Sequence, residues 1–514
     1  MTQTFPALVA GAAAENPGKP FLRCRSESGP VEISFAELEQ RSRRVAAGLR
    51  NLGIGRGDRV AIAASNQAEW LEFFFGAAGI GAITVTLNVR YRENELSFML
   101  AQSGARLVVS SATDGDTDLT AIYDKIKPGL PNLEHVFFLG AGDDWSRLTS
   151  SDGDGEPADV APDDPAMILY TSGTTGTPKG ATLTHGSIIG AARAQVQHFQ
   201  VRHDDVYAAV MPLNHVGGIT CTITAALLTR STVALQAAFS PSKALEAIAS
   251  NRATIFAGVP TMWTLMLADE SRQRHDTSSL RLAVIGGANA DPPLCAAICE
   301  AFPNARLHNL YGLSEVSGAC VISPPDDDQA TVARSIGVAL PGVELRAVDA
   351  DGREVEPGTD GELQVRGPGR AAGYWDNPEA TAATFLPDGW VATGDMVTIE
   401  PDGHVVLRGR RKEMFVQGGY NVYPVEVENV LAAHPAVAMV AGIGVPDPVL
   451  GEVGQYHIVL KPGTTATEEE LREFCAARLA DYKVPRRIVF ADELPLTPAG
   501  KIAKAKLRAE AAGS

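Results

Sequence analysis

The residues best suited to chemistry lie in one short loop, within MILYTSGTTGTPKGATLTH at positions 167–185. Hydroxyl side chains, glycine backbone amides and one lysine supply the donors and the positive charge that a bound triphosphate requires. The loop is not a Walker P-loop, because Thr177 and Pro178 separate Gly176 from the lysine, and this argues against a P-loop kinase. We predict a phosphate-binding loop formed by Thr171, Ser172, Gly173, Thr174, Thr175, Gly176 and Lys179.

Further along the chain, short polar or glycine-rich segments stand between apolar runs. They are MPLNHVGGIT (211–220), VIGGANADPPLC (284–295), HNLYGLSEVSG (308–318), TGD (393–395), GRRKE (409–413), QGGYNVYPVEVE (417–428) and PLTPAGKIAK (495–504). Tyr311 could stack on a nucleobase, Glu315 offers a hard oxygen ligand for Mg²⁺, and Asp395 could accept hydrogen bonds from two ribose hydroxyls. Taken alone, such residues are more often packed or solvated than engaged with a ligand.

In their order and spacing, these segments resemble the signature of the adenylate-forming superfamily of acyl-CoA synthetases, luciferases and peptide-synthetase adenylation domains. The resemblance extends along nearly the whole chain and is closest to the acyl-CoA synthetase, or fatty-acid–CoA ligase, branch. It implies that ATP activates a carboxylic acid as an acyl-adenylate, with release of pyrophosphate. The acyl group then passes to coenzyme A.

The resemblance also implies a role for each matching residue. Lys501 and Thr171 act in catalysis, and Glu315 acts there as the ligand of Mg²⁺. His215 lies beside the substrate carboxylate, although Asn214 stands where an aromatic residue is common. Lys412 is the hinge about which a C-terminal domain rotates. Contacts to the nucleotide or to the pantetheine arm are assigned to Gly287, Ala288, Asn289, Tyr311, Gly312, Ser314, Asp395, Arg410, Gly418 and Gly419. Other basic residues, namely Arg408, Arg411, Lys504 and Lys506, are interpreted as surface charges.

The elements that must hold these residues alternate between strand and helix in the first third of the chain. Ser34 and Glu37 predict a capping box at the start of a helix that ends near Gly53. Apolar runs predict strands at 59–64, 83–87 and 107–110, with a helix from about Asn66. Beyond about residue 340, Asp-Gly turns join strands, and helices are expected near 425–433 and 468–480. We predict an α/β fold, with an N-terminal domain (1–411) that includes a β-rich subdomain (about 335–411) and a mobile α+β C-terminal domain (412–514).

The bulk properties exclude several classes of protein. A chain of 514 residues is too long to fold around one hydrophobic core, so we expect two or more lobes. A formal charge of −17 argues against nonspecific nucleic-acid binding. The six cysteines include no CxxC pair and the N-terminus does not resemble a signal peptide, so we expect a cytoplasmic enzyme. The segment 207–229 has no charged residue, but its proline, asparagine, histidine and glycines favour a protein interior over a membrane. A homodimer is compatible with the resemblance.

Other functions within the same superfamily fit the sequence to different degrees. An amino-acid-activating module would need an aspartate near Asn214–His215, where the sequence has none. A luciferase-like enzyme or an acyl-AMP ligase with another acceptor would share the adenylate, whereas a noncatalytic relative would have lost the loop, Glu315 or Lys501.

The expected acid-pocket segments 211–220, 256–261 and 286–289 contain no Lys or Arg, which disfavours a second carboxylate on the substrate. Glycines in this region predict room for a bulky apolar tail, as in a fatty or aryl acid; they are Gly217, Gly218 and Gly258.

Overall fold

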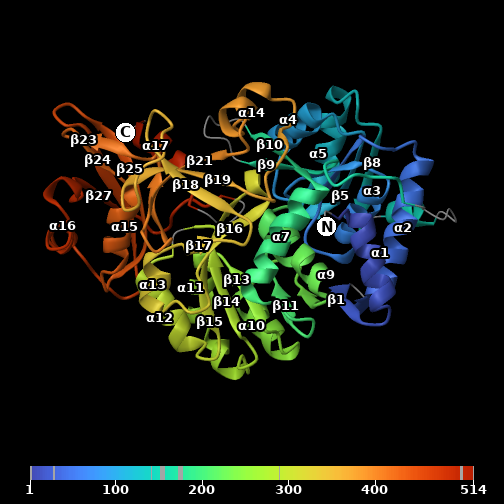
Figure 1. Cartoon of the computed structure of the whole chain (residues 1–514), viewed down its shortest axis with the longest axis horizontal. Coiled ribbons are helices and arrows are strands. Elements are labelled where there is room, and N and C mark those ends of the chain that lie inside the picture. Colours follow the sequence, from blue (N-terminus) through green and yellow to red (C-terminus); the bar gives the residue numbers. More distant parts are fainter. Residues whose placement is uncertain are drawn as a thin grey trace.

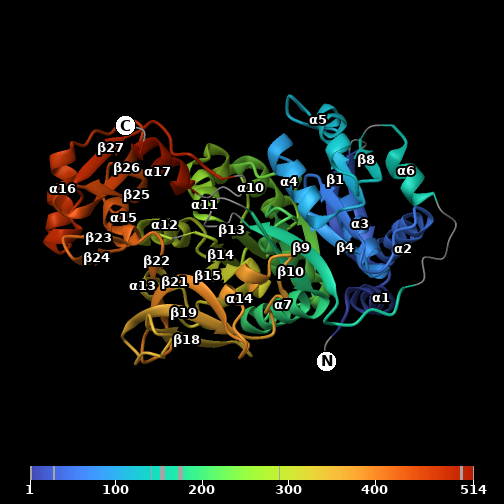
Figure 2. The same ribbon diagram turned by 90° about the horizontal axis from the view of Figure 1, so that it is seen from above.

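Two large β-sheets covered by helices form most of the molecule (Figure 1). The computed structural model describes residues 3–26, 29–140, 142–150, 157–171, 178–288, 290–497 and 502–512. The predicted α/β fold is confirmed: a large N-terminal part carries helix-covered sheets, and a smaller C-terminal part lies at one end of the molecule (Figures 1 and 2).

The first sheet holds the strands predicted in the first third of the chain. Their apolar runs are buried on both faces, as expected for parallel strands under helices. In spatial order the strands are β20 (Gly373–Tyr374), β10 (Lys179–Thr184), β9 (Pro165–Thr171), β4 (Ile83–Thr86), β3 (Arg59–Ala63), β5 (Leu107–Ser111) and β8 (His135–Leu139). The capping box at Ser34 and Glu37 is present at the start of α2 (Phe35–Asn51).

The second sheet is longer and has a parallel centre with antiparallel edges. Its strands in order are β17 (Val338–Ala339), β16 (Gly318–Ile322), β15 (Arg306–Leu313), β14 (Leu282–Gly286), β13 (Ile255–Gly258), β11 (Val206–Ala209), β12 (Thr232–Leu235), β1 (Pro20–Ser26) and β2 (Gly29–Ser34). Helix α7 (His185–Phe199) packs against β16 of this sheet and β10 of the first one, so it joins the two cores.

The other helices cover these sheets. In the N-terminal part they are α1 (Phe5–Glu15), α3 (Ala68–Gly79), α4 (Glu93–Ser103), α5 (Leu119–Ile126), α6 (Asp144–Thr149), α8 (Val216–Gly218), α9 (Ala225–Thr229), α10 (Pro241–Ser250), α11 (Pro260–Ala268), α12 (Pro292–Ala301), α13 (Gln329–Arg334) and α14 (Pro378–Thr384). In α12, Cys295 is buried and packs in an apolar cluster. All six cysteines lie in the described part of the chain, and each of them is a free thiol there.

A four-stranded antiparallel sheet follows, in the region predicted to be β-rich. It consists of β18 (Glu344–Val348), β19 (Asp360–Arg366), β21 (Val391–Ile399) and β22 (Val405–Arg410). The Val405 amide donates to the Gly337 carbonyl at 2.8 Å and the Val405 carbonyl accepts from Ile336, which ties this sheet to the edge of the longer one. It therefore forms a bridge between the large sheets and the C-terminal part (Figure 2).

The C-terminal part has its own sheet, whose strands are β23 (Phe415–Gln417), β24 (Tyr420–Val422), β25 (Val437–Asp447), β26 (Gly451–Leu460) and β27 (Arg487–Phe490). Its helices are α15 (Pro424–Ala432), α16 (Glu468–Ala476) and α17 (Lys504–Ala512). Helix α16 ends four residues before the predicted 480. The chain turns there into a short 3₁₀ helix, where the Tyr482 ring stacks on Tyr420 with centroids 4.5 Å apart.

The uncharged segment 207–229 lies in the protein interior, as predicted. Most of it is buried, and Ile219–Thr224 forms a π-helical turn, η2, between α8 and α9. The Thr222 hydroxyl donates to the Gly217 carbonyl and the Thr224 hydroxyl to the Ile219 carbonyl, at 2.9 and 2.8 Å. Among the described residues, none of the helices is both long and apolar enough to span a bilayer.

One buried histidine makes stability depend on pH. His185 begins α7, is 0% exposed, and accepts a hydrogen bond from the Phe5 amide at Nδ1. Burial lowers the pKa of His185 to about 4, against an ordinary value of 6.5. Between these values the unfolded chain binds a proton that the folded chain does not, so the stability that His185 contributes is lost as pH falls from about 6.5 to 4.

We therefore expect His185→Asn to weaken the pH dependence of unfolding, because asparagine can accept the Phe5 hydrogen bond without titrating. As pH falls through this window, the free energy of unfolding should decrease by up to about 1.4 kcal/mol per pH unit more in the wild type than in the variant. Urea unfolding at pH 7 and pH 5 measures the difference. Equal pH dependence in the two proteins would show that His185 does not contribute.

Candidate active site

Three predicted site residues meet around one buried carboxylate. The Tyr311 hydroxyl donates to Oδ2 of Asp395 at 2.6 Å, and Nε of Arg410 lies 2.7 Å from Oδ1. Asp395 and Arg410 are cross-strand partners on β21 and β22, whereas Tyr311 comes from β15 of the long sheet. The antiparallel hairpin therefore places the ion pair, and the packing of two sheets adds the tyrosine.

The surroundings of Asp395 set its electrostatics. Only 3% of this residue is exposed. Burial raises the pKa of the Asp395 carboxyl above its ordinary value, while the Arg410 charge and the Tyr311 hydroxyl oppose that rise. Since each carboxylate oxygen has two acceptor positions, both oxygens can still accept hydrogen bonds from a pair of sugar hydroxyls.

A second group of site residues meets at Tyr374, which the sequence reasoning did not single out. The Tyr374 hydroxyl donates to Oε1 of Glu315 at 2.6 Å, and Nζ of Lys179 lies 5.3 Å from the centroid of its ring. Strand β20 carries Tyr374 alongside β10, where Ala181 pairs with it. The Gly-Tyr-Trp run at 373–375, an aromatic pair directly after a glycine, is the signal that could have identified it.

The structure describes only the ends of the predicted phosphate-binding loop. Thr171 ends β9 and Lys179 begins β10, and the two are paired across the antiparallel ladder. The two ends of the loop are thus side by side, next to Tyr374 and Glu315. The predicted residues Ser172, Gly173, Thr174, Thr175 and Gly176 lie outside the described residues, and so do Asn289 and Lys501.

His215 stands at the start of the uncharged segment. Its Nδ1 accepts a hydrogen bond from the Gly217 amide at 3.1 Å, so the side chain caps α8. A Cβ on Gly218 would lie 2.2 Å from the Pro212 carbonyl oxygen, which explains why this position needs glycine. The histidine is therefore held by its own backbone, on the segment that was predicted to line the acid pocket.

Gly418 and Gly419 form the turn between β23 and β24. Both have positive φ, 60° and 89°, a backbone conformation that favours glycine. The Gly418 amide donates to the Leu450 carbonyl at 3.0 Å, and nothing lies within 4 Å of a Cβ placed on Gly419. The apolar side chains of Tyr420 and Val449 are exposed beside this turn.

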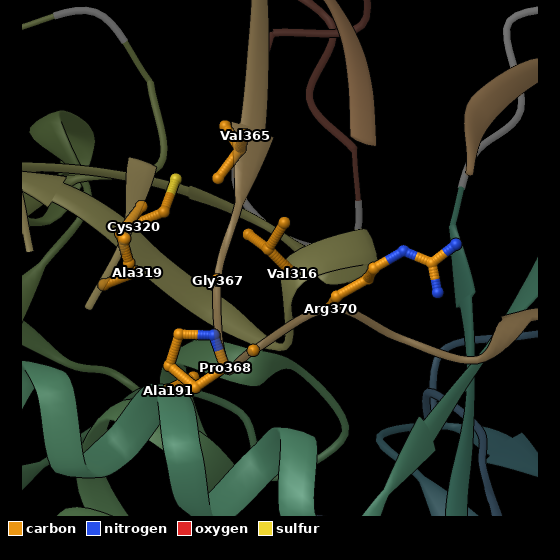
Figure 3. Close-up of a pocket in the computed structure, with 10 residues that line it drawn as sticks. Ala191, Val316, Ala319, Cys320, Val365, Gly367, Pro368 and Arg370 are labelled. Atoms are coloured by element: carbon orange, nitrogen blue, oxygen red, sulfur yellow. The ribbon is translucent and has the colours of Figure 1, made fainter. Parts of the chain in front are cut away.

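A small cavity lies near the site but does not belong to it. It is lined by Ala191, Val316, Cys320, Val365 and Pro368, among others, where α7, β16 and the end of β19 meet (Figure 3). Its volume is about 10 Å³, enough for at most one water molecule. In Figure 3 the Arg370 side chain points away from Cys320 and Val365, so the cavity is a packing void lined by apolar groups.

Among the described side chains, Glu315 is a carboxylate that could hold a magnesium ion together with substrate phosphates. No group of three or more His, Cys, Asp or Glu side chains that could hold a metal is found in the described part of the chain. Mg²⁺ commonly binds through one or two carboxylates together with substrate phosphates and water. Glu315 meets this requirement, because only Oε1 accepts from Tyr374 and the residue lies beside Lys179 at the end of the phosphate loop.

The pattern of the AMP-binding enzyme family matches residues 9–375, and that of the AMP-binding enzyme C-terminal domain matches 426–501. The chain belongs to the AMP-binding enzyme family. Feruloyl-CoA synthase of an Amycolatopsis species is 37% identical over 93% of this chain and 94% of its own. A CoA ligase of Rhodococcus jostii strain RHA1, named for a bicyclic methyl-dioxo-octahydroindenyl propanoyl group, is 35% identical over 94% of both chains.

A solved structure of the anthranilate CoA ligase AuaEII in complex with anthranoyl-AMP has the same fold. Its TM-score is 0.91 at 29% identity, and the match covers 99% of this chain and 98% of that one. Membership of the AMP-binding family and these ligase relatives make the chain an AMP-forming acid–CoA ligase, which uses ATP and coenzyme A. The predicted family and activity class are confirmed.

The basic residues interpreted as surface charges divide into two groups. Arg411 is 62% exposed and pairs with Glu362, Lys506 is exposed, and Arg408 is 30% exposed and pairs with Asp360. For Lys504 the interpretation is wrong. Its side chain is 16% exposed and contacts two carboxylates, because α17 folds back onto the start of the C-terminal part.

Asp395→Asn tests whether the buried carboxylate holds a nucleotide. The KM for ATP should rise by about 10- to 100-fold, because hydrogen bonds to a charged acceptor are replaced by weaker neutral ones. The KM for the acid should change little. ATP–pyrophosphate exchange measures both constants.

Asp360→Asn is the matched control, since Asp360 lies on the same sheet and pairs with Arg408, but its side chain is 48% exposed. An unchanged KM for ATP in Asp395→Asn would contradict the assignment of this carboxylate to the nucleotide.

Proposed function

We propose that this ligase activates an apolar carboxylic acid in two half-reactions that share one cleft. The observation that carries the proposal is the Tyr311–Asp395–Arg410 cluster, which supplies an aromatic ring and a ribose acceptor. Glu315 and Lys179 stand nearby at Tyr374. A nucleoside and a triphosphate need these groups together.

In the first half-reaction, a carboxylate oxygen of the acid attacks the α-phosphorus of ATP. The bond from that phosphorus to pyrophosphate breaks, and an acyl-adenylate forms. Asp395 and Arg410 hold the ribose, Gly287, Ala288 and Asn289 lie along the adenine with Tyr311 and Gly312, and Thr171, Ser314 and Lys179 contact the phosphates. Lys501 bridges the carboxylate and the α-phosphate, where its charge stabilises the in-line displacement.

In the second half-reaction, the thiol of coenzyme A attacks the acyl carbonyl, and AMP leaves as the carbon–oxygen bond breaks. We propose that residues 412–514 rotate about Lys412 between the halves, withdrawing Lys501 and bringing Gly418 and Gly419 to the pantetheine arm. A side chain at Gly419 would occupy the passage. Such a movement separates two steps that need different groups at the same carbonyl.

Glu315 would hold Mg²⁺ together with phosphate oxygens, and the ion would neutralise charge on the departing pyrophosphate. The Tyr374 hydroxyl orients the Glu315 carboxylate by its hydrogen bond to Oε1. His215, fixed by the Gly217 amide, would lie beside the acid carboxylate.

The acid is proposed to be apolar, aryl or fatty, for a reason that the structure has altered. The sequence predicts room for a bulky tail at Gly217, Gly218 and Gly258, but neighbouring atoms lie 3.0, 2.2 and 3.1 Å from a Cβ built on each. Neighbouring atoms therefore occupy the space beside these glycines, and they do not indicate room for a substrate tail. What supports an apolar acid is the absence of Lys and Arg from the pocket segments and the ring-bearing acyl groups in the names of two relatives.

A screen of acids by CoA-dependent AMP release tests the substrate class. We expect turnover with cinnamate-type, other aryl or fatty acids and little with short diacids, since a second carboxylate would be buried without a cation. Fast turnover only with malonate or oxalate would contradict the apolar pocket. Light emission or acyl-AMP accumulation in the presence of coenzyme A would favour a luciferase-like enzyme or an acyl-AMP ligase instead.

Lys501→Ala tests the division into half-reactions. ATP–pyrophosphate exchange should fall by about 100- to 1,000-fold, because a charge aimed at the transition state is lost. Conversion of presynthesised acyl-adenylate and coenzyme A to thioester should be retained. Lys506→Ala is the control, since Lys506 follows Lys501 closely in the sequence and is exposed on α17. Normal exchange in Lys501→Ala would show that this lysine has no role in adenylation.

The cellular setting is also a proposal. The free thiols among the described residues favour a reducing compartment such as the cytoplasm. A homodimer is the simplest assembly to test, by sedimentation of the purified enzyme.

A further inference from the structure

Lys504 is the first residue of α17, and its ammonium lies between two carboxylates. Nζ is 2.7 Å from Oε1 of Glu428 and 3.3 Å from Oε2 of Glu413. The three side chains are 16%, 12% and 23% exposed. Burial lowers the pKa of Lys504, but Glu428 and Glu413 raise it by more, so the net shift is upward and the lysine is charged at neutral pH.

The cluster joins three separate stretches of the C-terminal part. Glu413 directly follows the proposed hinge Lys412, and Glu428 lies on α15. Lys504 follows the segment that contains Lys501. Oε1 of Glu428 also accepts from the Gly442 amide of β25 at 2.6 Å, which fixes this carboxylate independently of the lysine.

The backbone closes around the same point. Leu496 and Ile502 form a β-bridge, and the Ala503 amide donates to the Pro495 carbonyl at 2.7 Å. The two ends of the segment that contains Lys501 are therefore held together. Lys504 follows these paired ends directly and attaches them to Glu413. Helix α17 itself is anchored by Leu507, which is buried in an apolar cluster with Ile443 and Val453 of β25 and β26.

The position of the charge is not explained by the helix. A lysine in the first turn is unfavourable for the helix dipole, which favours acidic residues there. Its compensation comes from the two carboxylates, and both of them lie outside α17. Leu507 already packs the helix against the sheet. The ion pairs therefore add a separate constraint, which fixes Lys504 relative to Glu413 beside the proposed hinge.

We propose that Lys504 is a positioning residue, which couples rotation at the hinge to the placement of Lys501. All three members of the cluster lie in the part proposed to rotate, so they move as one body. The inference rests on the proposed role of Lys501. Lys504 does not contact the substrate. It determines whether Lys501 reaches the correct position at the α-phosphate.

The test compares Lys504→Met and Lys504→Arg in the full-length enzyme, with Lys506→Met as the matched control. ATP–pyrophosphate exchange should show kcat lowered by about 10- to 100-fold in Lys504→Met, since an ångström of misplacement costs that much, with KM for ATP unchanged. Thioester formation from presynthesised acyl-adenylate should persist. Lys504→Arg, which keeps the charge, should recover most of the exchange activity.

Two results with Lys504→Met would overturn the inference. One is normal exchange in Lys504→Met. The other is a parallel fall of both half-reactions together with a lower melting temperature, which would mean that Lys504 only stabilises the fold. Because Lys504→Met leaves two partly buried carboxylates without a cation, the triple variant Glu413→Gln/Glu428→Gln/Lys504→Met is also needed. Exchange that stays low in this variant at wild-type stability supports positioning, and restored exchange refutes it.

Lys501→Ala separates this inference from the proposed function. If Lys501→Ala loses exchange and Lys504→Met does not, only the positioning role fails. If Lys501→Ala keeps normal exchange, the proposed catalytic role fails and the inference falls with it.

Discussion

A buried carboxylate shared by a tyrosine and an arginine is the interaction on which the site depends. Asp395 is almost fully enclosed, and a charge in such a place is tolerated only when hydrogen bonds and an opposite charge replace the water that it lost. Arg410 provides the charge from the neighbouring strand. Tyr311 provides the hydrogen bond from a different sheet. The charge on Asp395 is therefore fully stabilised only when the two sheets pack correctly.

The same constraint determines where the triphosphate would lie. Strand β15 runs from Tyr311 into the turn with Glu315, whose carboxylate accepts from Tyr374 of β20. Since β20 pairs with β10, the turn is tied to the strand that begins at Lys179. Strand pairing and two tyrosine hydroxyls therefore bring the proposed ribose-binding and phosphate-binding groups to one edge where three sheets meet.

Much of this could be predicted from the sequence, where local patterns determine local structure. The capping box at Ser34, the buried strands of the first third and the antiparallel strands after residue 340 all follow from short-range chemistry. The family and its ligase activity followed from ordered motifs. Tyr374 and the enclosure of Lys504 could not be predicted in this way. Their partners, Glu315 and Glu413, are distant in the sequence, and only tertiary packing shows that a charge is paired. The glycines failed as indicators of pocket size, because a missing side chain can be filled by neighbouring backbone, as at Gly218.

Activation of the acid as an adenylate can be followed by isotope transfer. With both oxygens of the carboxylate labelled with oxygen-18, attack on the α-phosphorus places one labelled oxygen in the phosphate of AMP and leaves the other in the thioester. Mass spectrometry of the two products measures this. We expect AMP to carry one labelled oxygen in every turnover. Unlabelled AMP, or label found in inorganic phosphate beside ADP, would contradict it.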